Sequence, residues 1–457
     1  MFKQVAKELD VPALEREQIE RWRERDTMAR YLAKDDASET RFSFLDGPIT
    51  ANNPMGVHHA WGRTYKDLFQ RFHAMLGEKQ RFQNGFDCQG LWIEVEVEKQ
   101  LGFNNKREIE AFGIDRFVEL CKARVDQFVA IQTEQSKRLG YWMDWDNSYY
   151  TNSDENNYTI WAFLAECHRR GLIYRGHDVM PWCPRCGTGL SNMEIATEGY
   201  RELRHLSLTI RLPITSAGHE HEDLLVWTTT PWTLSSNVAA AVNPALTYQL
   251  VEGRDGRRWW VSHGSKRRVA GDAPVLAEAT GAELVGLTYD GPFDELPVAA
   301  RVEHRVVAWG EVSDEEGTGI VHIAPGCGQE DFALSKEHGL AVLDPIDESG
   351  VFRAGYGWQT GRFAGATPEP KDDIAYEVAA NLEEKGLLVA RQQYSHHYPV
   401  CWRCQTQLVF RLVVEWFIAM DPLRAPLSEA TRPWPGCRRA SAWRSASSTG
   451  CATWATG

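Results

Sequence analysis

Two Cys-x-x-Cys pairs, far apart in the sequence, constrain the fold of this chain more than any other feature. The first is Cys183-Pro-Arg-Cys186 and the second is Cys401-Trp-Arg-Cys404. Such a pair on a tight turn presents two thiolates to one metal ion, and two pairs complete a tetrahedral Cys₄ zinc site. A closed site of this kind is structural. Residues 187–400 must then leave and return to one place, which predicts an inserted domain.

A redox dithiol is the alternative use of such a pair, but it needs a thioredoxin-like setting that the sequence does not show. Ten cysteines in 457 residues do not suggest a disulfide framework. This length predicts two or three domains. The net charge of −13 argues against a generally basic nucleic-acid coat, although it leaves room for a local basic groove. With no bilayer-length apolar run and no signal-peptide core, we expect no membrane association and a cytoplasmic location.

The first domain opens with a phosphate-loop pattern. A strand-like run at Phe42–Leu45 ends at Asp46-Gly47-Pro48, and a loop rich in Gly, Asn and Pro leads to Gly56-Val57-His58-His59 and a helical pattern. Strand, small-residue loop and helix together place backbone N–H groups and a positive helix end against a phosphate chain. A surface loop with two incidental histidines is the alternative.

A second strand-like run ends at Asp87, just before a turn at Gly90 and another helical pattern. Open α/β sheets place ligand groups at such strand ends, where a carboxylate can hold an ammonium ion. The alternative is an N-cap for the following helix. Residues 104–175 are predicted to be mostly helical.

The segment between the cysteine pairs alternates apolar and polar residues in short runs separated by turns, which predicts a β-rich barrel with a few helices. Two clusters stand out there. Thr228-Thr229-Thr230 precedes a proline, with Asn237 beyond, and His322 and Asp331 flank a Gly/Pro turn. Hydroxyls in a row can orient a water or a ribose hydroxyl. Plain β-propensity, a core histidine and a helix cap are the separate alternatives, but together the clusters favour a small hydrolytic pocket.

These motifs together resemble the class I aminoacyl-tRNA synthetases of the isoleucyl type, over roughly residues 1–425. Gly47-Pro48 through His59 resembles the ATP-binding signature region, and Gly85–Glu94 is similar to the amino-acid-binding strand. The resemblance implies an α/β fold: a Rossmann-like catalytic half, an inserted β-rich, barrel-like editing domain and a zinc-knuckle module. The implied parts are a helical arm (1–41), the catalytic half with the first knuckle (42–190), the editing insert (191–395), the second knuckle with a strand that returns to the first sheet (396–424), and an aberrant, disordered tail (425–457).

The resemblance also implies the reaction. Isoleucine and ATP, with Mg²⁺, form isoleucyl-adenylate, and the acyl group passes to tRNA-Ile; no residue acts as a covalent or acid–base catalyst, because positioning and charge stabilisation dominate. The protein is expected to be a monomer. The implied residues are Gly56, His58 and His59 for ATP; Gly47, Pro48 and Asp87 for isoleucine; Thr228, Thr229, Thr230, Asn237, His322 and Asp331 for hydrolytic editing of valyl-tRNA; and Cys183, Cys186, Cys401 and Cys404 for structural Zn²⁺.

Two departures from the family pattern affect these expectations. Gly56-Val57-His58-His59 exchanges the first His and the Gly of the usual His-x-Gly-His signature, a variant known in one branch of isoleucyl enzymes. The lysine-rich second signature and the anticodon-binding domain are absent from the sequence. A shifted reading frame of residues 448–457 resembles the family segment where the catalytic sheet resumes. We therefore expect a frameshifted or truncated product, shifted between Arg424 and Arg444, that does not form isoleucyl-adenylate at a useful rate.

The sequence leaves three alternative functions. The sequence Asp87-Cys88-Gln89-Gly90-Leu91 disfavours a valyl- or leucyl-type synthetase. A non-catalytic RNA-binding or trans-editing module with zinc is a different class, which deacylation without ATP would reveal. A zinc oxidoreductase lacks the Gly-x-Gly-x-x-Gly that should open a helix after a strand.

Overall fold

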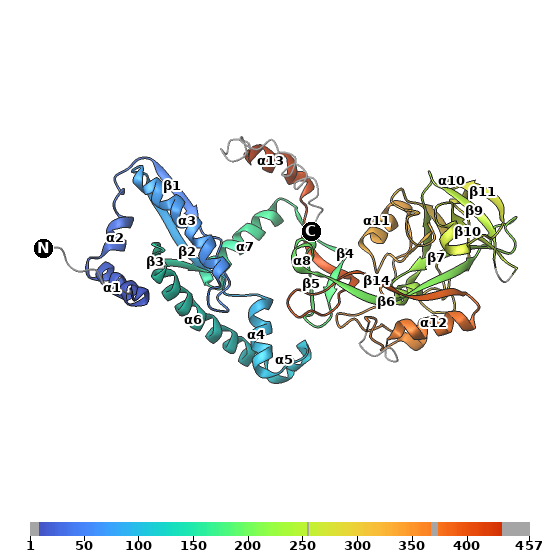
Figure 1. The fold of residues 1–457 in the computed structure, drawn as a ribbon, viewed down its shortest axis with the longest axis horizontal. Coiled ribbons are helices and arrows are strands. Elements are labelled where there is room, and N and C mark those ends of the chain that lie inside the picture. The colour runs from blue at the N-terminus through green and yellow to red at the C-terminus, as the bar shows by residue number, and fades with distance from the viewer. Residues whose placement is uncertain (1–8, 254–255, 367–372, 432–457) are drawn as a thin grey trace. The chain divides into compact units, whose positions relative to one another are not determined.

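The computed structural model describes residues 9–253, 256–366 and 373–431. The chain divides into two compact units, Met1–Ile173 and Tyr174–Gly457 (Figure 1). Within the described ranges, no helix is both long enough and apolar enough to cross a membrane. The predicted change of reading frame lies mostly within residues 432–457, outside the described residues.

The amino-terminal unit is built on a parallel sheet with strand order β1-β2-β3. Parallel strands need a crossover connection. Here α3 connects β1 to β2, and α4, α5 and α6 connect β2 to β3. α3 packs against β1 and β2 (Figure 1). This confirms the predicted parallel α/β arrangement. The elements are β1 (Arg41–Leu45), α3 (Val57–Met75), β2 (Lys79–Phe86), α4 (Leu91–Leu101), α5 (Lys106–Phe112), α6 (Ile114–Arg138), β3 (Asp144–Tyr150) and α7 (Asp154–Arg169).

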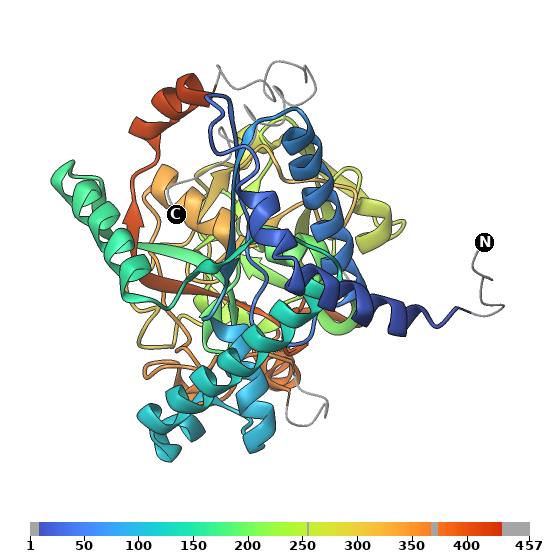
Figure 2. The same cartoon turned by 90° about the vertical axis from the view of Figure 1, so that its left-hand side faces the viewer.

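Two helices precede the sheet, α1 (Val11–Glu24) and α2 (Thr27–Leu32), as the helical pattern before residue 42 predicts. α1 packs on α6, where Arg138 pairs with Glu15 at 2.9 Å (Figure 2). β3 interrupts the region predicted to be helical. Its sequence, Asp-Trp-Asp-Asn-Ser-Tyr-Tyr, lacks apolar alternation, and pairing with β2 supplies the order that local sequence does not.

The carboxy-terminal unit is rich in β-structure, as predicted. A six-stranded sheet has the order β11-β9-β10-β7-β6-β14, and two three-stranded sheets have the orders β12-β8-β13 and β15-β4-β5. The strands are β4 (Ile173–Cys183), β5 (Thr188–Gly189), β6 (Tyr200–Pro213), β7 (Glu222–Thr228), β8 (Ala239–Val242), β9 (Thr247–Glu252), β10 (Arg258–Ser262), β11 (Val275–Thr280), β12 (Arg305–Ala308), β13 (Val321–Ile323), β14 (Leu388–Pro399) and β15 (Val409–Ile418).

The described helices of this unit are short, except α11, α12 and α13. They are α8 (Asn192–Glu198), η1 (Pro231–Ser236), α9 (Lys266–Ala270), α10 (Gly281–Leu284), α11 (Gln329–His338), η2 (Gly357–Gln359), α12 (Ile374–Glu384) and α13 (Asp421–Thr431). α12 packs on β6 and β14. Its apolar side joins the main core, in which Leu208, Ile210 and Leu212 of β6 are fully buried.

The pairing of β6 with β14 confirms that the residues between the cysteine pairs leave and return at one place. The antiparallel ladder runs from Tyr200 opposite Pro399 to Leu388 opposite Ile210, so both ends of the insert lie side by side (Figure 1). β11 and β14 stand at the two ends of the six-stranded order. No pairing among the described strands joins those two ends, so the sheet is open and the predicted barrel closure is not observed.

Two details near the C-terminus differ from the sequence-based expectations. β15 is a strand, but it pairs with β4 instead of returning to the sheet of β1, β2 and β3. Its neighbour is set by the second cysteine pair, which holds the start of β15 beside the end of β4. Residues 425–431, assigned to the disordered tail, belong to α13, because Leu, Ala and Glu favour helix after the Asp421-Pro422 start.

Truncating the core of the six-stranded sheet should destabilise the carboxy-terminal unit. We expect Leu208→Ala to lower the free energy of unfolding by about 2–5 kcal/mol, because the lost methyl groups leave a cavity that the sheet cannot close. Urea unfolding followed by circular dichroism measures this loss. Leu276→Ala is the matched control, since Leu276 is 49% exposed, and it should change stability by less than about 0.5 kcal/mol. Equal effects would contradict the assigned core.

Candidate functional site

The loop after β1 is held at Asp46, directly before Gly47 and Pro48. The Asp46 carboxylate is buried and forms ion pairs with Lys66 and, at 4.0 Å, with Arg63 of α3. The Tyr149 hydroxyl donates to the Asp46 carbonyl at 2.7 Å. Side chain and backbone of Asp46 are thus both fixed, which sets the start of the predicted amino-acid-binding loop.

The structure brings Asp87 to this same loop. Asp87 follows β2, where Thr50 Oγ1 donates to its Oδ2 at 2.8 Å and the Ala51 N–H donates to its carbonyl at 2.8 Å. The alternative of an N-cap is wrong, because Gly90 with φ of 103° occupies the cap of α4. Within the described ranges, no hydrogen bond to the second carboxylate oxygen of Asp87 accompanies the one from Thr50 to Oδ2.

Gly56, His58 and His59 lie together at the N-terminus of α3. Gly56 is the N-cap residue, its N–H donates to His59 Nδ1 at 3.1 Å, and the two imidazole rings are 3.8 Å apart. His59 therefore carries its proton on Nε2. Partial burial, with His58 and Arg63 nearby, lowers the pKa of His59, so its imidazole is mainly neutral at pH 7. A helix N-terminus with two imidazoles is suited to bind phosphate oxygens.

In the carboxy-terminal unit, the two predicted clusters line one cavity of about 320 Å³. The Thr run comes from the end of β7, His322 from β13 and Asp331 from the first turn of α11. The volume lies at the lower end of the range for small-ligand pockets. The cavity is lined by Trp227, Thr228, Thr229, Thr230, Trp232, Thr233, Val321, His322, Ala324, Cys327, Asp331, Tyr398 and Phe410.

Burial sets the charge states in this cavity. The Asp331 Oδ2 accepts from the Ala324 N–H at 2.8 Å, but burial still raises the pKa of Asp331 to about 6. Burial lowers the pKa of His322 to about 4, so its ring is neutral at pH 7. The Thr233 hydroxyl donates to the Thr230 carbonyl at 2.8 Å, hence His322 Nε2–H must donate to Thr233 Oγ1 at 3.0 Å. His322 Nδ1 makes no hydrogen bond within the described part of the chain and carries a lone pair.

Asn237 does not line the cavity. Its Nδ2 donates to the Ala239 carbonyl at 2.9 Å and its Oδ1 accepts from the Tyr289 hydroxyl at 2.9 Å. Both ends of this buried amide are thus engaged in the core. Sequence reasoning also missed five aromatic or thiol residues of the wall. Trp227 and Trp232 flank the Thr run, so their place in the cavity wall could have been predicted from the sequence. No sequence pattern around Cys327, Tyr398 or Phe410 indicates that they line the cavity.

The four cysteines of the two pairs converge. Their Sγ atoms lie within 4.8 Å of one another, and those of Cys183 and Cys186 are each 3.5 Å from that of Cys404. Tetrahedral Zn²⁺ with Zn–S bonds of about 2.3 Å needs sulfurs about 3.8 Å apart, so the cluster fits this metal. All eight cysteines of the described ranges are free of disulfides. With four protein ligands the site has no open position for a substrate.

The two pairs share one local geometry. Gly187 N–H donates to the Cys183 carbonyl at 2.9 Å, and Gln405 N–H donates to the Cys401 carbonyl at 2.7 Å. The residue after each pair is left-handed, with φ of 60° at Gly187 and 63° at Gln405. A non-glycine residue in this region costs about 1–2 kcal/mol, a cost that sulfur–metal bonds offset readily.

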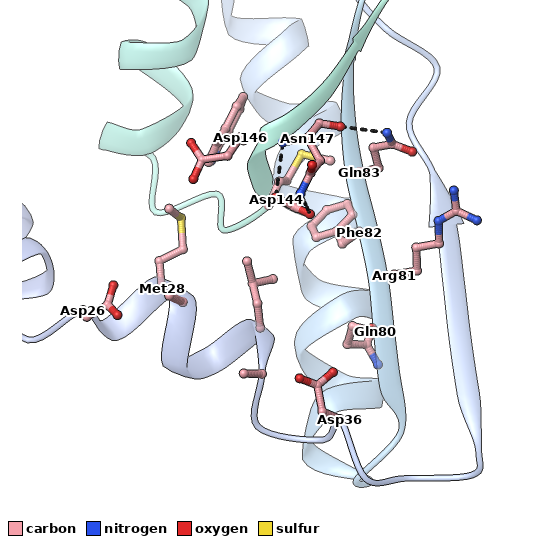
Figure 3. Close-up of a pocket in the computed structure, with 15 residues that line it drawn as sticks. Asp26, Met28, Asp36, Gln80, Arg81, Phe82, Gln83, Asp144, Asp146 and Asn147 are labelled. Atoms are coloured by element: carbon pink, nitrogen blue, oxygen red, sulfur yellow. Dashed lines mark hydrogen bonds between the residues drawn. The ribbon is translucent and has the colours of Figure 1, made fainter. Parts of the chain in front are cut away.

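A further cavity of about 570 Å³ lies at the opposite, amino-terminal ends of β2 and β3, beside α2 (Figure 3). Its wall carries the carboxylates of Asp26, Asp36, Asp144 and Asp146, while the Arg81 side chain points away from Asp144 in Figure 3. Sequence reasoning gave no signal for it. Since Asp87 and the phosphate-loop pattern sit at the carboxyl ends of the strands, this cavity is separate from the predicted nucleotide site.

Comparisons with known proteins identify the family of this chain. The family described as "tRNA synthetases class I (I, L, M and V)" matches residues 17–442. The isoleucine–tRNA ligase of Methanothermobacter thermautotrophicus is 38% identical over 88% of this chain and 37% of its own length. That of Streptomyces coelicolor is 37% identical over 93% of this chain and 40% of its own length. The solved structure "The crystal structure of GlLeuRS-CP1" covers 41% of this chain and 99% of that chain, at a TM-score of 0.31 and 15% identity. The chain spans about two fifths of the length of the curated relatives it matches.

Removing one thiolate should cost the metal and the fold around it. We expect the purified chain to hold one zinc ion, and Cys404→Ser to reduce the zinc content strongly and lower Tm, because an incomplete ligand set binds weakly. Metal analysis and thermal unfolding measure both effects. Cys121→Ser is the control, a half-buried cysteine of the amino-terminal unit, and should leave zinc content unchanged. Full zinc content in Cys404→Ser would contradict the assigned ligands.

Proposed function

The chain belongs to the class I aminoacyl-tRNA synthetases of the isoleucyl, leucyl, methionyl and valyl group, and from this we propose that it is of the isoleucyl type. The substrates of that type are isoleucine, ATP with Mg²⁺ and tRNA-Ile, and the proposed location is the cytoplasm. The observation that carries the proposal is the cavity that gathers Thr228–Thr230, His322 and Asp331. Sequence identity to relatives named isoleucine–tRNA ligase supports the choice of amino acid.

In this proposal the amino-terminal unit supplies part of the activation site. The free oxygen of Asp87 holds the α-ammonium of isoleucine, and the loop at Gly47 and Pro48, fixed through Asp46, borders the same group. Gly56, His58 and His59 offer the α3 N-terminus to the phosphates of ATP. These groups orient the carboxylate for attack on the α-phosphate, so their contribution is positioning rather than proton transfer.

An editing cavity has a physical reason in an enzyme of this specificity. A single methylene in a hydrophobic pocket is worth only about 1–3 kcal/mol, a limit for which isoleucyl enzymes are the known illustration, so valine is activated too. A second, smaller site can admit the valyl ester and hydrolyse it. The cavity of about 320 Å³ in the carboxy-terminal unit is our candidate for that second site.

The side chains of the cavity suit this hydrolysis. The ionised Asp331 carboxylate anchors the α-ammonium of the valyl group, and the Thr228–Thr230 segment presents hydroxyls to the ester and the attacking water. The neutral His322 donates its Nε2–H to Thr233 and so fixes the Thr233 hydroxyl in the cavity wall. Asn237 keeps the cavity wall in place from the core, through its bonds to Ala239 and Tyr289.

Two other functions make different predictions. A valyl- or leucyl-type enzyme would deacylate a different mischarged tRNA, so the identity of the hydrolysed ester separates these types. A trans-editing or RNA-binding module without activation chemistry would deacylate or bind tRNA but would not depend on Asp87 for isoleucine binding. The hydrogen bond by which Thr50 fixes the Asp87 carboxylate favours the synthetase.

The editing activity is directly testable. We expect the full chain to deacylate Val-tRNA-Ile in the absence of ATP, and Asp331→Ala to slow this at least about 30-fold, because truncating one partner of a buried ion pair costs about 2 kcal/mol or more. Release of labelled valine measures the rate. Glu330→Ala is the matched control, since Glu330 is the adjacent, exposed carboxylate of α11. Equal rates for the Asp331→Ala variant and the unmodified chain would refute the assignment.

The same site predicts a pH dependence. Asp331 must be ionised to hold an ammonium group, and its pKa is raised to about 6, whereas the pKa of His322 is lowered to about 4. Deacylation should therefore increase as the pH rises from 5 to 7, with one apparent pKa near 6. Rates corrected for spontaneous ester hydrolysis give the profile. Asp331→Asn should flatten it, and an unchanged profile in that variant would assign the titration to another group.

A further inference from the structure

Residues 314–319, which we call the supporting segment, contact the wall of the cavity of about 320 Å³ from outside it. The segment reads Asp-Glu-Glu-Gly-Thr-Gly and leads into β13. None of its residues is among the described residues that line the cavity, but a Cβ atom on Gly317 would stand 2.8 Å from Cε3 of Trp227. Because Trp227 lines the cavity directly before Thr228, the backbone at Gly317 supports this wall from behind.

The contact between Gly317 and Trp227 leaves no room for a larger residue. The φ angle of Gly317 is 60°, in the region that favours glycine, and an added Cβ would overlap the indole ring. Tyr394 of β14 meets the same ring edge to face, with 5.1 Å between the ring centroids. Desolvation and the nearby Glu316 carboxylate raise the pKa of Tyr394, so the supporting segment borders both aromatic side chains.

Arg268 of α9 holds the middle of the supporting segment. Its Nε and Nη2 donate to the Gly317 carbonyl at 3.3 and 3.0 Å, and Nη2 also donates to the Asp314 carbonyl at 3.2 Å. A planar guanidinium can bond two acceptors in one fixed orientation. Both of these acceptors are backbone carbonyls, so the contact fixes the course of the backbone and does not depend on a partner's charge.

The two ends of the supporting segment have anchors of their own in the core. Ser265 Oγ donates to the Asp314 carbonyl at 3.2 Å, and the Tyr248 hydroxyl donates to the Gly319 carbonyl at 2.8 Å. Both donor residues are fully buried. The midpoint of the segment is the part that contacts the indole ring, and its carbonyl is bonded by the exposed guanidinium. Loss of that guanidinium should therefore release the midpoint while the ends stay in place.

A small movement of Trp227 is enough to change which acyl group fits beside Thr228. One methylene in an apolar pocket changes discrimination by a factor of about 10–200. A misplacement of about 1 Å can cost a reaction on the order of 100-fold. The selectivity of the cavity should therefore respond to the supporting segment at displacements that leave the fold intact.

We propose that Arg268 is a positioning residue for the selectivity of this cavity: it holds Gly317 against Trp227 and so fixes the width of the cavity next to Thr228. The inference rests on the proposed hydrolysis of valyl-tRNA and names residues that limit the size of its substrate. In Arg268→Ala the ring can move away from the cavity, which widens it. In Gly317→Ala the added methyl group pushes the ring into the cavity, which narrows it. The two variants therefore shift selectivity in opposite directions.

Deacylation by the full chain of tRNA-Ile charged with alanine, valine or isoleucine tests the proposal. We expect Arg268→Ala to lower the ratio of kcat/KM for the valyl over the isoleucyl ester at least about fivefold, and Gly317→Ala to lower that for the valyl over the alanyl ester by a similar factor. Arg267→Ala is the matched control, since Arg267 is the adjacent exposed arginine of α9, and should change neither ratio. Equal losses on all three esters in Arg268→Ala, or the same shift in the control, overturn the proposal.

Arg268→Lys separates support of the wall from direct contact with tRNA. It keeps the charge but loses the planar fork, so it should lower the valyl over isoleucyl ratio as Arg268→Ala does, without raising KM for tRNA. A normal ratio in Arg268→Lys, with a raised KM for tRNA in Arg268→Ala, would show that the charge binds tRNA and would overturn the proposal.

The same assay distinguishes failure of this inference from failure of the proposed function. Absence of valyl-tRNA hydrolysis by the unmodified chain would refute the proposed function and this inference with it. Valyl-tRNA hydrolysis by the unmodified chain, with an unchanged ratio in Arg268→Ala, would overturn the inference alone. Arg268 is exposed, so this variant leaves the core intact where Gly317→Ala introduces strain.

Discussion

Closure of the four-cysteine cluster is the constraint on which the carboxy-terminal unit depends. It joins Cys183, at the end of β4, to the turn at residues 401–404, between β14 and β15. Because the two cysteine pairs meet, the segment between them must start and end at the same place. The antiparallel pairing of β6 with β14 joins the two ends of this segment. The same junction explains why β15 lies beside β4. One local interaction thus selects the strand neighbours of a large insert.

The two units differ in what surrounds a buried carboxylate. Asp46 is buried, with 2% of its surface exposed; Arg63 and Lys66 pair with its carboxylate, and the Tyr149 hydroxyl donates to its backbone carbonyl. Asp331 accepts from the Ala324 N–H and forms no ion pair within the described ranges, so desolvation dominates and its pKa rises. A site that must receive an ammonium group from a ligand has to leave its carboxylate without a resident cation. In the proposed function, this contrast separates a structural carboxylate, Asp46, from a ligand-binding one, Asp331.

Sequence reasoning succeeded where chemistry or periodicity is local. Cys-x-x-Cys spacing, the turn at Asp46 and the alternation in β6 and β7 each contain their own signal. It failed where order comes from distant partners. β3 is polar and becomes a strand only beside β2. The sequence predicts Asn237 as a cavity residue, but both ends of its amide bond to the core, at Ala239 and Tyr289. Short alternating runs separated by turns predict a barrel, but no pairing among the described strands closes the six-stranded sheet.

The cysteine cluster and the cavity differ in chemistry, but the same hairpin around the second cysteine pair contributes to both. Tyr398 precedes the second cysteine pair and Phe410 follows it, and both line the cavity. Between them, the Tyr398 hydroxyl donates to the Leu408 carbonyl at 3.0 Å and the Cys401 N–H donates to the Thr406 carbonyl at 2.8 Å. The hairpin that carries two sulfur ligands therefore also sets the distance between two cavity residues. A metal without an open coordination position can in this way influence a reaction that it never contacts, by fixing the shape of the site.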